Sequence, residues 1–507
     1  MPEQILEKFK KWLRPEWKSA FIASVVIGFL IHLYAFVNYL PNHDGLINIH
    51  NTQLKFKLGR FFLGPFSGIS SFFDLPFVIG VLSILYLAIT AVLIVEILKL
   101  RKTLSIWLTA GLVVSFPTVA STFSYMFTAD GYMMGFLLAA LAVLVTQKFK
   151  YGFIAGALIF YLSVGIYQAN LPFALTLIAL VWLQELLFGN RKIKVMVYKW
   201  TNYVWTIGIG MILYAITFKT YQTYFAGEIT DYQGLSEIGA GSLNLLSAFV
   251  AIKDSMLSFF FGGFQADIPM TFMDVLNIVL VFITIAGLIW ALRRLSIGHI
   301  VLVVGVFVTM PVLSYCMYFV SPGVEYHMLM VMGLVSFYIL PILFYDQMIS
   351  EKRFGQGIAW STVIILGLTV FNFGLIANIS YFNTTLKYEK SISYANRVLD
   401  RMEQTDGYEN VTKLAIFGTY YLKSELGSST IPDKLPSMTG VIGETILAQP
   451  YHYQYLFANE FGESFHLASE LEKNTIQDSE WFEGMPTWPH PDSIRVEGDI
   501  IVIKLNN

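Results

Sequence analysis

The sequence predicts an all-α polytopic membrane protein with about eleven transmembrane helices and a small C-terminal α/β domain. Of its 507 residues, 55% are hydrophobic and 13% are charged, with a mean hydropathy of +0.60. Soluble domains usually carry about 25% charged residues, so most of this chain is expected to lie in a bilayer. Residues 385–507 differ, because they hold 18 acidic and 10 basic side chains. We therefore expect an amphipathic N-terminus at 1–18, a membrane core at 19–384 and a separate domain at 385–507.

Eleven apolar stretches are long enough to cross a hydrocarbon layer of about 30 Å. They are residues 19–39, 76–98, 104–122, 131–146, 151–166, 171–188, 201–220, 271–291, 300–320, 327–345 and 356–377. The single cysteine, Cys316, lies in one of them, so neither a disulfide framework nor a thiolate metal cluster is expected.

Basic residues sort the loops into two sets. Lys and Arg gather at the N-terminus and in alternate loops, a pattern typical of the cytoplasmic side. The N-terminus is therefore expected inside, and we interpret it as a retained segment rather than a signal peptide. The remaining loops, including the long segments 40–75 and 221–270, are expected outside together with the C-terminal domain. Apolar and aromatic stretches in both long loops are typical of helices that lie along the membrane surface.

The C-terminal domain carries signals of both helix and strand. The segment TTLKYEKSISYANRVLDRMEQ has helical spacing, and KLAIFGTYYL is typical of a buried strand. The segment SIRVEGDIIVIKL predicts a hairpin that turns around Gly498 and Asp499. These elements predict a small α/β domain of the outer side.

The first outer loop carries the strongest sign of function. Between Pro41 and Arg60 the ionisable side chains are His43, Asp44, His50, Lys55, Lys57 and Arg60. Charges near a membrane are costly and usually mark a functional site or an interface anchor. A glycosyl transfer needs a carboxylate that takes the proton from the attacking hydroxyl, and cations that stabilise the leaving phosphate. Asp44 fits the role of the base, and the alternative is that it caps a short helix beginning at Gly45.

The cations of this loop fit the second role. Arg60 carries a planar fork that can hold a phosphate through two hydrogen bonds. Lys55, Lys57, His43 and His50 are candidates for further contacts to the phosphate. The alternative for the lysines is anchoring to lipid headgroups, and the alternative for the histidines is packing.

Other polar groups lie at the predicted outer ends of spans. Asp130 in FTADGYMMG is a second acid, either close to Asp44 or acting as a helix N-cap. Gln168 in GIYQANLP, and Tyr326 and His327 in SPGVEYHM, are candidates for hydrogen bonds to substrate.

The sequence contains neither a GxxxxGK[ST] phosphate loop nor a GxGxxG motif, and it has no cytoplasmic segment large enough for a nucleotide-sugar domain. This favours a donor that the bilayer carries, which needs a lateral gap between spans and a cationic patch at headgroup depth. No nucleic-acid partner is expected.

Four short motifs resemble a known family. They are NHDG followed by GRFF in the first outer loop, TADG after the third span and IYQA after the fifth. Together with a long hydrophobic body and a small outer domain, they resemble the bacterial glucosyl transferase II (Gtr type) membrane proteins of the GT-C class. The resemblance implies a polyprenyl-phosphate donor carrying one sugar, such as glucose. It also implies transfer to a polysaccharide, teichoic acid or O-antigen on the outer face of the cytoplasmic membrane.

The resemblance also implies roles for residues. Its acid in the first outer loop corresponds to Asp44, its phosphate-binding cations to Arg60 with Lys55, Lys57 or His50, and its later acid to Asp130. Many metal-dependent GT-C enzymes carry two adjacent acids in this loop, whereas Asp44 lies between His43 and Gly45. No tightly bound metal and no other cofactor is therefore expected.

Two other functions compete with a transferase. A transporter or flippase of a lipid-linked sugar would need charges deep within spans, but most charges here lie at span ends. A polysaccharide polymerase or ligase would place arginines in a large outer loop, and 221–270 contains none.

Overall fold

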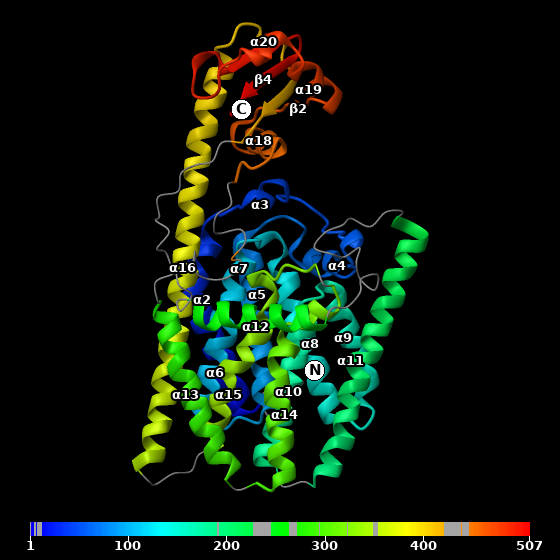
Figure 1. The fold of residues 1–507 in the computed structure, drawn as a ribbon, viewed down its shortest axis with the longest axis vertical. Helices are drawn as coiled ribbons and strands as arrows, with labels where there is room; N and C mark the ends of the chain where they lie inside the picture. The colour runs from blue at the N-terminus through cyan, green and yellow to red at the C-terminus, as the bar shows by residue number, and fades with distance from the viewer. Residues whose placement is uncertain are drawn as a thin grey trace.

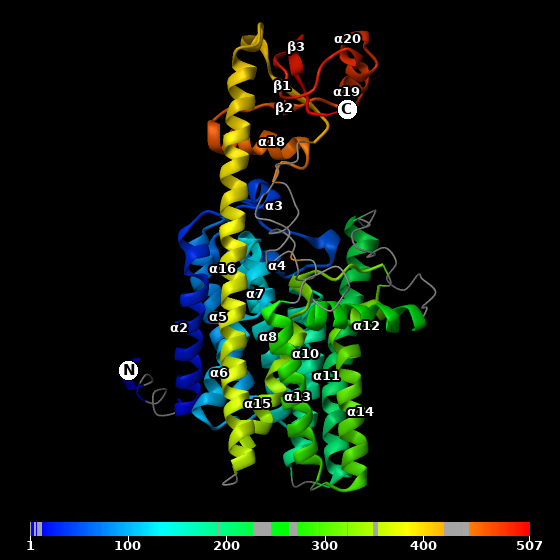
Figure 2. The same cartoon turned by 60° about the vertical axis from the view of Figure 1, so that its left-hand side comes forward.

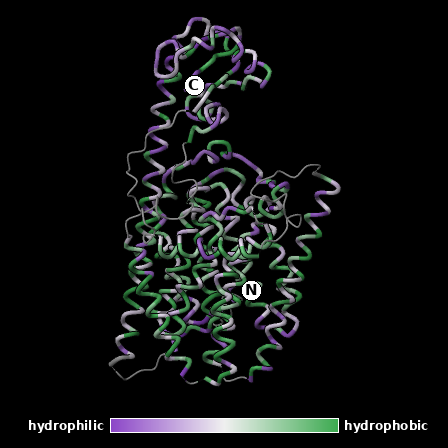
Figure 3. Tube along the Cα trace, in the orientation of Figure 1, coloured by the Kyte–Doolittle hydropathy of each residue, from purple (hydrophilic) through white to green (hydrophobic). Residues whose placement is uncertain are grey.

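The computed structural model of the chain describes residues 2–4, 7, 13–189, 192–226, 245–262, 271–293, 295–321, 323–347, 353–419, 438 and 446–506. A helical bundle forms the larger, lower part of the molecule as drawn, and a small α/β domain stands above the upper end of this bundle (Figures 1 and 2). Hydrophobic residues are concentrated in the bundle, and hydrophilic ones are more frequent in the domain (Figure 3). The predicted amphipathic N-terminus lies largely outside the described residues.

The bundle is built from apolar helices, most of them long. They are α2 (Pro15–Val37), α5 (Pro76–Ile97), α6 (Thr103–Ser115), α7 (Pro117–Phe123), α8 (Ala129–Lys148), α9 (Gly152–Ile166), α10 (Asn170–Phe188), α11 (Ile193–Tyr221), α13 (Phe272–Leu292), α14 (Ile297–Ser314), α15 (Val335–Gln347) and α16 (Arg353–Glu403). Among the described residues, nine helical segments are long and apolar enough to cross a membrane, and two shorter apolar helices accompany them. The prediction of a mostly α-helical polytopic membrane protein is confirmed.

Proline explains one difference from the predicted spans. The predicted span 104–122 is divided into α6 and α7, because Pro117 begins α7 and Phe116 before it has an extended ψ of 139°. A residue before proline is disfavoured in the helical conformation. The break puts α7 and the residues after it at the end of the bundle that faces the domain (Figure 1).

The last span continues into the domain without a break. We predicted a span at 356–377 and a separate helix from 384, but α16 is one helix of 51 residues. Neither glycine nor proline occurs between residues 375 and 403 to end it. At 1.5 Å per residue, α16 is about 75 Å long, more than twice the thickness of a hydrocarbon core. The predicted domain boundary at residue 385 therefore lies inside a continuous helix.

The domain contains a four-stranded sheet of order β2-β1-β4-β3. Its strands are β1 (Lys413–Phe417), β2 (His466–Leu467), β3 (Ile494–Glu497) and β4 (Ile500–Lys504). The predicted strand is β1, which pairs in parallel with β2 and β4, and the predicted hairpin is β3–β4 with Gly498 in a left-handed conformation (φ 64°). Its helices are α18 (Pro450–Leu456), α19 (Glu470–Gln477) and α20 (Glu480–Glu483).

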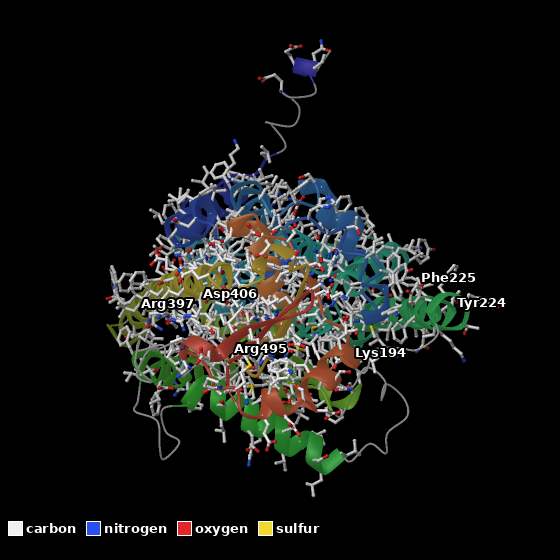
Figure 4. The ribbon with its side chains drawn as sticks, turned by 90° about the horizontal axis from the view of Figure 1, so that it is seen from above. Lys194, Tyr224, Phe225, Arg397, Asp406 and Arg495 are labelled. Atoms are coloured by element: carbon white, nitrogen blue, oxygen red, sulfur yellow. The ribbon has the colours of Figure 1, made fainter. Side chains whose placement is uncertain are left out.

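Short helices cover the end of the bundle below the domain. The loop at residues 40–75, which we predicted to be the first outer loop and call by that name, forms α3 (His43–Ile47), a 3-10 turn at Phe56–Leu58 and α4 (Leu63–Ser67). In the second long loop, α12 (Leu245–Phe261) lies across the bundle helices in both side views, as we expected for a surface helix (Figures 1 and 2). Seen from above, Arg495 and Asp406 of the domain lie over the bundle, whereas Tyr224 and Phe225 lie at its edge (Figure 4).

Candidate functional site

Helix α3 places Asp44 at the end of the bundle that faces the domain. The helix begins at His43, and its N-cap is Asn42, whose side chain accepts a hydrogen bond from Gly45 N at 2.8 Å. The alternative that Asp44 caps a helix beginning at Gly45 is therefore wrong. The Asp44 side chain is 40% exposed, and its Oδ2 lies 3.7 Å from His43 Nε2. A carboxylate in this position is accessible to a ligand.

A tight turn at residues 55–60 presents the cations. Lys55 and Arg60 form an antiparallel bridge, and Gly59 between them adopts φ 69°. A Cβ at Gly59 would lie 2.3 Å from Tyr214 Oη, so only glycine fits both the backbone and the space. Gln168 donates hydrogen bonds to Leu58 O at 2.7 Å and to Tyr214 Oη at 2.8 Å. The membrane helices therefore hold this turn.

Arg60 lies against two aromatic rings. It donates a hydrogen bond to Tyr132 Oη at 2.8 Å, and its guanidinium carbon lies 4.8 Å from the centroid of the Tyr167 ring. Tyr132 and Tyr167 are stacked, with centroids 4.7 Å apart and planes 18° apart. This contact fixes the guanidinium, and flat aromatic faces of this kind also suit the apolar face of a sugar ring.

These groups meet in one cavity of about 440 Å³, which we call the first cavity. Its ionisable lining residues are His43, Asp44, Lys55, Arg60, Glu325 and His327, and its aromatic lining residues include Tyr125, Phe127, Tyr132 and Tyr167. Volumes of about 300–1,000 Å³ are usual for ligand sites. The structure thus brings a carboxylate and two cations of the first outer loop together with the turn that follows α14.

Lys55 is the second cation of this cavity, and it lies in the field of both Asp44 and Arg60. Burial lowers the pKa of its ammonium, Asp44 acts in the opposite direction, and Arg60 lowers the pKa further. Within the described part of the chain, its Nζ makes no hydrogen bond or ion pair. A half-buried ammonium beside a guanidinium is suited to bind an anion such as phosphate.

Other predicted residues lie outside the first cavity. Lys57 and His50 are exposed, and the His50 ring packs on Phe73 at 4.4 Å. Gln168 supports the 55–60 turn, and Tyr326 accepts a hydrogen bond from Met317 N at 3.0 Å. No structural observation tests the phosphate-binding or substrate-binding roles that we predicted for these four residues.

Asp130 lies behind the wall of the first cavity. Its side chain is fully buried, and Oδ1 accepts a hydrogen bond from Gly131 N at 2.8 Å. The N-cap of α8 is Thr128, so the N-cap alternative for Asp130 is wrong. Thr128 and Tyr132 on either side of it line the cavity. Its role as a second acid stays a prediction.

Sequence reasoning missed several residues of this region. Tyr132 directly follows the TADG motif, and Tyr167 lies within the IYQA motif, directly before Gln168. Both motifs therefore already pointed to these tyrosines. Asp74 was also missed; its backbone N–H donates to Ile49 O at 2.8 Å and so joins the two ends of the loop. Burial raises the pKa of the Asp74 carboxyl to about 7.

The C-terminal domain packs directly on α3. The Leu46 side chain belongs to the hydrophobic cluster of the domain, and Asn459 Nδ2 donates to Leu46 O at 3.0 Å. Burial raises the pKa of Tyr451 on α18, and the Asp44 carboxylate raises it further. The domain is therefore a neighbour of the candidate base.

His452 on α18 joins the same contact. Its ring centroid lies 5.8 Å from that of His43, and its Nδ1 accepts hydrogen bonds from the backbone of Ala448 and Gln449. Burial, with a smaller effect of His43, lowers the pKa of His452 to about 4. The ring is therefore neutral near pH 7.

Among the described residues, no three His, Cys, Asp or Glu side chains gather closely enough to hold a metal ion. The expectation that no metal is tightly bound stays a prediction.

Comparison with known proteins gives one match. The family model described as Glucosyl transferase GtrII matches residues 33–338, which include α3, the 55–60 turn and the turn after α14. No curated protein and no solved structure matches the chain.

Proposed function

The chain belongs to the glucosyl transferase GtrII family, and on that premise we propose a more specific activity. The protein moves a single sugar, glucose or a similar hexose, from a polyprenyl-phosphate donor to a cell-surface glycan. The acceptor is a polysaccharide, a teichoic acid or an O-antigen. The reaction takes place on the outer face of a bacterial cytoplasmic membrane, with the N-terminus inside and the domain outside.

The observation that carries this proposal is the composition of the first cavity. One loop supplies both a carboxylate, Asp44, and two cations, Lys55 and Arg60, to a space of about 440 Å³. Phosphate recognition needs the cations, and proton removal from a hydroxyl needs the carboxylate.

In the proposed step, the acceptor hydroxyl oxygen attacks the anomeric carbon of the donor sugar. The bond from this carbon to the phosphate oxygen breaks, and the phosphate keeps the electron pair. Asp44 takes the proton of the attacking hydroxyl. Arg60 and Lys55 stabilise the negative charge that grows on the leaving phosphate. The stacked Tyr132 and Tyr167 hold Arg60 in place and offer an aromatic face to the sugar.

The lipid-linked donor is supported by the position of these cations. They lie on the short turn next to the outer ends of α8, α9 and α11, where a phosphate at headgroup depth would be found. At the other end of the bundle, several cations are engaged in ion pairs, such as Arg14 with Glu96 at 3.1 Å and Lys148 with Glu96 at 2.7 Å.

The test is sugar transfer from a synthetic polyprenyl-phosphate glucose to purified cell-surface polysaccharide, with wild type beside Asp44→Asn. The asparagine keeps the shape and removes the base, so transfer is expected to fall by about 10²–10⁴-fold, while donor binding is retained. Asp492→Asn, a change at an 82% exposed acid of the domain, is the matched control and should transfer normally. Full activity of Asp44→Asn would show that Asp44 is not the base.

A further inference from the structure

A second cavity of about 420 Å³ adjoins the first. Glu325 and His327 line both cavities, so these two side chains form the boundary between them. The far side of the second cavity is formed by Asp254, Ser255 and Ser258 of α12. A two-substrate enzyme needs two such adjoining spaces, and the first already holds the groups for the phosphate.

Three tyrosines form a fixed aromatic wall in the second cavity. The ring of Tyr326 lies 4.8 Å from the rings of both Tyr315 and Tyr318. Their hydroxyl groups are held by the protein: Tyr326 accepts from Met317 N at 3.0 Å, and Tyr318 Oη lies 3.0 Å from Ser255 Oγ. These contacts hold Tyr318 and Tyr326 in place, and because Tyr315 is only 2% exposed, the rings of these two residues supply most of the aromatic surface of the wall.

The charges of the two cavities differ. The first contains Lys55 and Arg60, whereas the described lining of the second includes neither lysine nor arginine. Its charged groups are the carboxylates of Glu325 and of Asp254; the Asp254 side chain is 60% exposed and pairs with Lys253, which does not line the cavity, at 3.0 Å. Since Glu325 lines both cavities, the difference lies in the cations: the described lining of the second cavity has none to pair with a phosphate, whereas its carboxylates accept hydrogen bonds from sugar hydroxyl groups.

The second cavity also differs from the place that suits a lipid chain. A separate groove of about 290 Å³ between α12, α13 and α14 is lined by apolar side chains such as Phe260, Leu280 and Phe307. An isoprenoid chain gains from apolar contact alone, so the polar second cavity is the poorer site for it.

We propose that the second cavity binds the acceptor, as an uncharged sugar unit of the glycan that stacks on the tyrosine wall. Its carboxylates and the Ser258 hydroxyl bind the hydroxyl groups of this sugar. The attacking hydroxyl then passes between Glu325 and His327 toward Asp44. This assignment rests on the proposed function, and it adds where each substrate binds.

The test is a substitution that fills the second cavity and leaves the lining of the first cavity unchanged. Ser258→Trp places a large ring in the second cavity, and Leu257→Trp, one residue earlier on α12 at a 44% exposed position, is the matched control. Both variants and wild type are given polyprenyl-phosphate glucose, and two products are measured: free glucose formed without acceptor, and glucose transferred to purified cell-surface polysaccharide. Thermal unfolding verifies that each variant is folded.

The expected result is a loss of transfer for Ser258→Trp of tenfold or more, with unchanged donor hydrolysis, and no change for Leu257→Trp. Asp254→Asn, which preserves shape, should raise the acceptor KM by about tenfold, as expected for one lost charged hydrogen bond. Unchanged acceptor KM in both Ser258→Trp and Asp254→Asn would overturn the assignment. Loss of donor hydrolysis in folded Ser258→Trp would overturn it too, because the cavity would then serve the donor.

Failure of the proposed function can be distinguished from failure of the acceptor assignment. If wild type neither hydrolyses nor transfers from polyprenyl-phosphate glucose, the donor itself is wrong, and the acceptor assignment falls with it. If wild type transfers and the two cavity variants match it, only the acceptor assignment is wrong.

Discussion

Two parts of the first outer loop are held by different regions of the molecule. The acid arm, residues 43–47, packs on the C-terminal domain through Leu46 and Asn459. The cation arm, residues 55–60, packs on the membrane helices through hydrogen bonds of Gln168 to Leu58 and Tyr214. One loop thus presents its carboxylate from the domain side and its cations from the membrane side.

This difference separates two tasks of the site. In the proposed reaction, the cation arm binds the donor phosphate and the acid arm takes the acceptor proton. The distance between Asp44 on the acid arm and the cations of the cation arm therefore depends on how the domain is docked on the bundle. Changes to the cation arm are expected to weaken donor binding and also to slow departure of the phosphate, whereas changes to the docking of the acid arm are expected to slow the chemical step and leave donor binding unchanged.

The largest effect on the cation arm is expected from Arg60→Ala. Loss of a charge-assisted contact to phosphate costs about 1.5–3 kcal/mol, so the donor KM should rise by about 10–100-fold. Steady-state kinetics with varied polyprenyl-phosphate glucose measures it. Lys57→Ala is the matched control, because this exposed cation of the same arm does not line the cavity. Equal effects of the two changes would show that Arg60 does not bind the donor phosphate in the first cavity.

A smaller effect is expected from Leu46→Ala on the acid arm. Truncating a buried leucine costs about 2–5 kcal/mol, which here weakens the docking of α3 on the domain. We expect kcat to fall by about tenfold (1.4 kcal/mol of the cost) with an unchanged donor KM. Ile503→Ala removes a buried side chain of the same hydrophobic cluster from β4, so it controls for loss of domain stability. If Ile503→Ala lowers kcat equally, the contact of Leu46 has no special role.

The smallest effect is a pH dependence of the docking contact. A free histidine has a pKa near 6.5, whereas that of His452 is lowered to about 4, so folding requires its neutral form. Its contribution to stability is complete above pH 6.5 and is lost as the pH falls toward 4. The Tm should fall for wild type between pH 7 and pH 5. This fall should exceed that of His452→Asn by on the order of 2–4 °C.

His452→Asn keeps an acceptor for the backbone N–H groups of Ala448 and Gln449, which precede α18, and removes the titration. Asp74, with a pKa of about 7, acts in the opposite direction, because its protonated form is favoured in the folded protein. It is present in both proteins, so its effect cancels in the difference. Equal slopes of Tm against pH would show that His452 does not couple docking to pH.

The sequence located the candidate site more reliably than it located the members of the site. The density of charge between Pro41 and Arg60 pointed to a loop of which Asp44, Lys55 and Arg60 line one cavity. Lys57 carries the same charge as Lys55 but is exposed, and local sequence cannot distinguish the two. Tyr132 and Tyr167 were overlooked because aromatic residues are common at the ends of membrane helices.

Composition and hydropathy by themselves determined the membrane class, nearly all the spans, the strand at Lys413–Phe417 and the hairpin at Gly498. These features are local, since burial in lipid and strand alternation are written in neighbouring residues. The tertiary structure alone decided that α16 carries the domain over the bundle and that Asn459 contacts Leu46, 413 residues away. It also decided that Glu325 and His327 lie between two cavities. Such contacts arise from the packing of distant segments, which no local pattern of residues specifies.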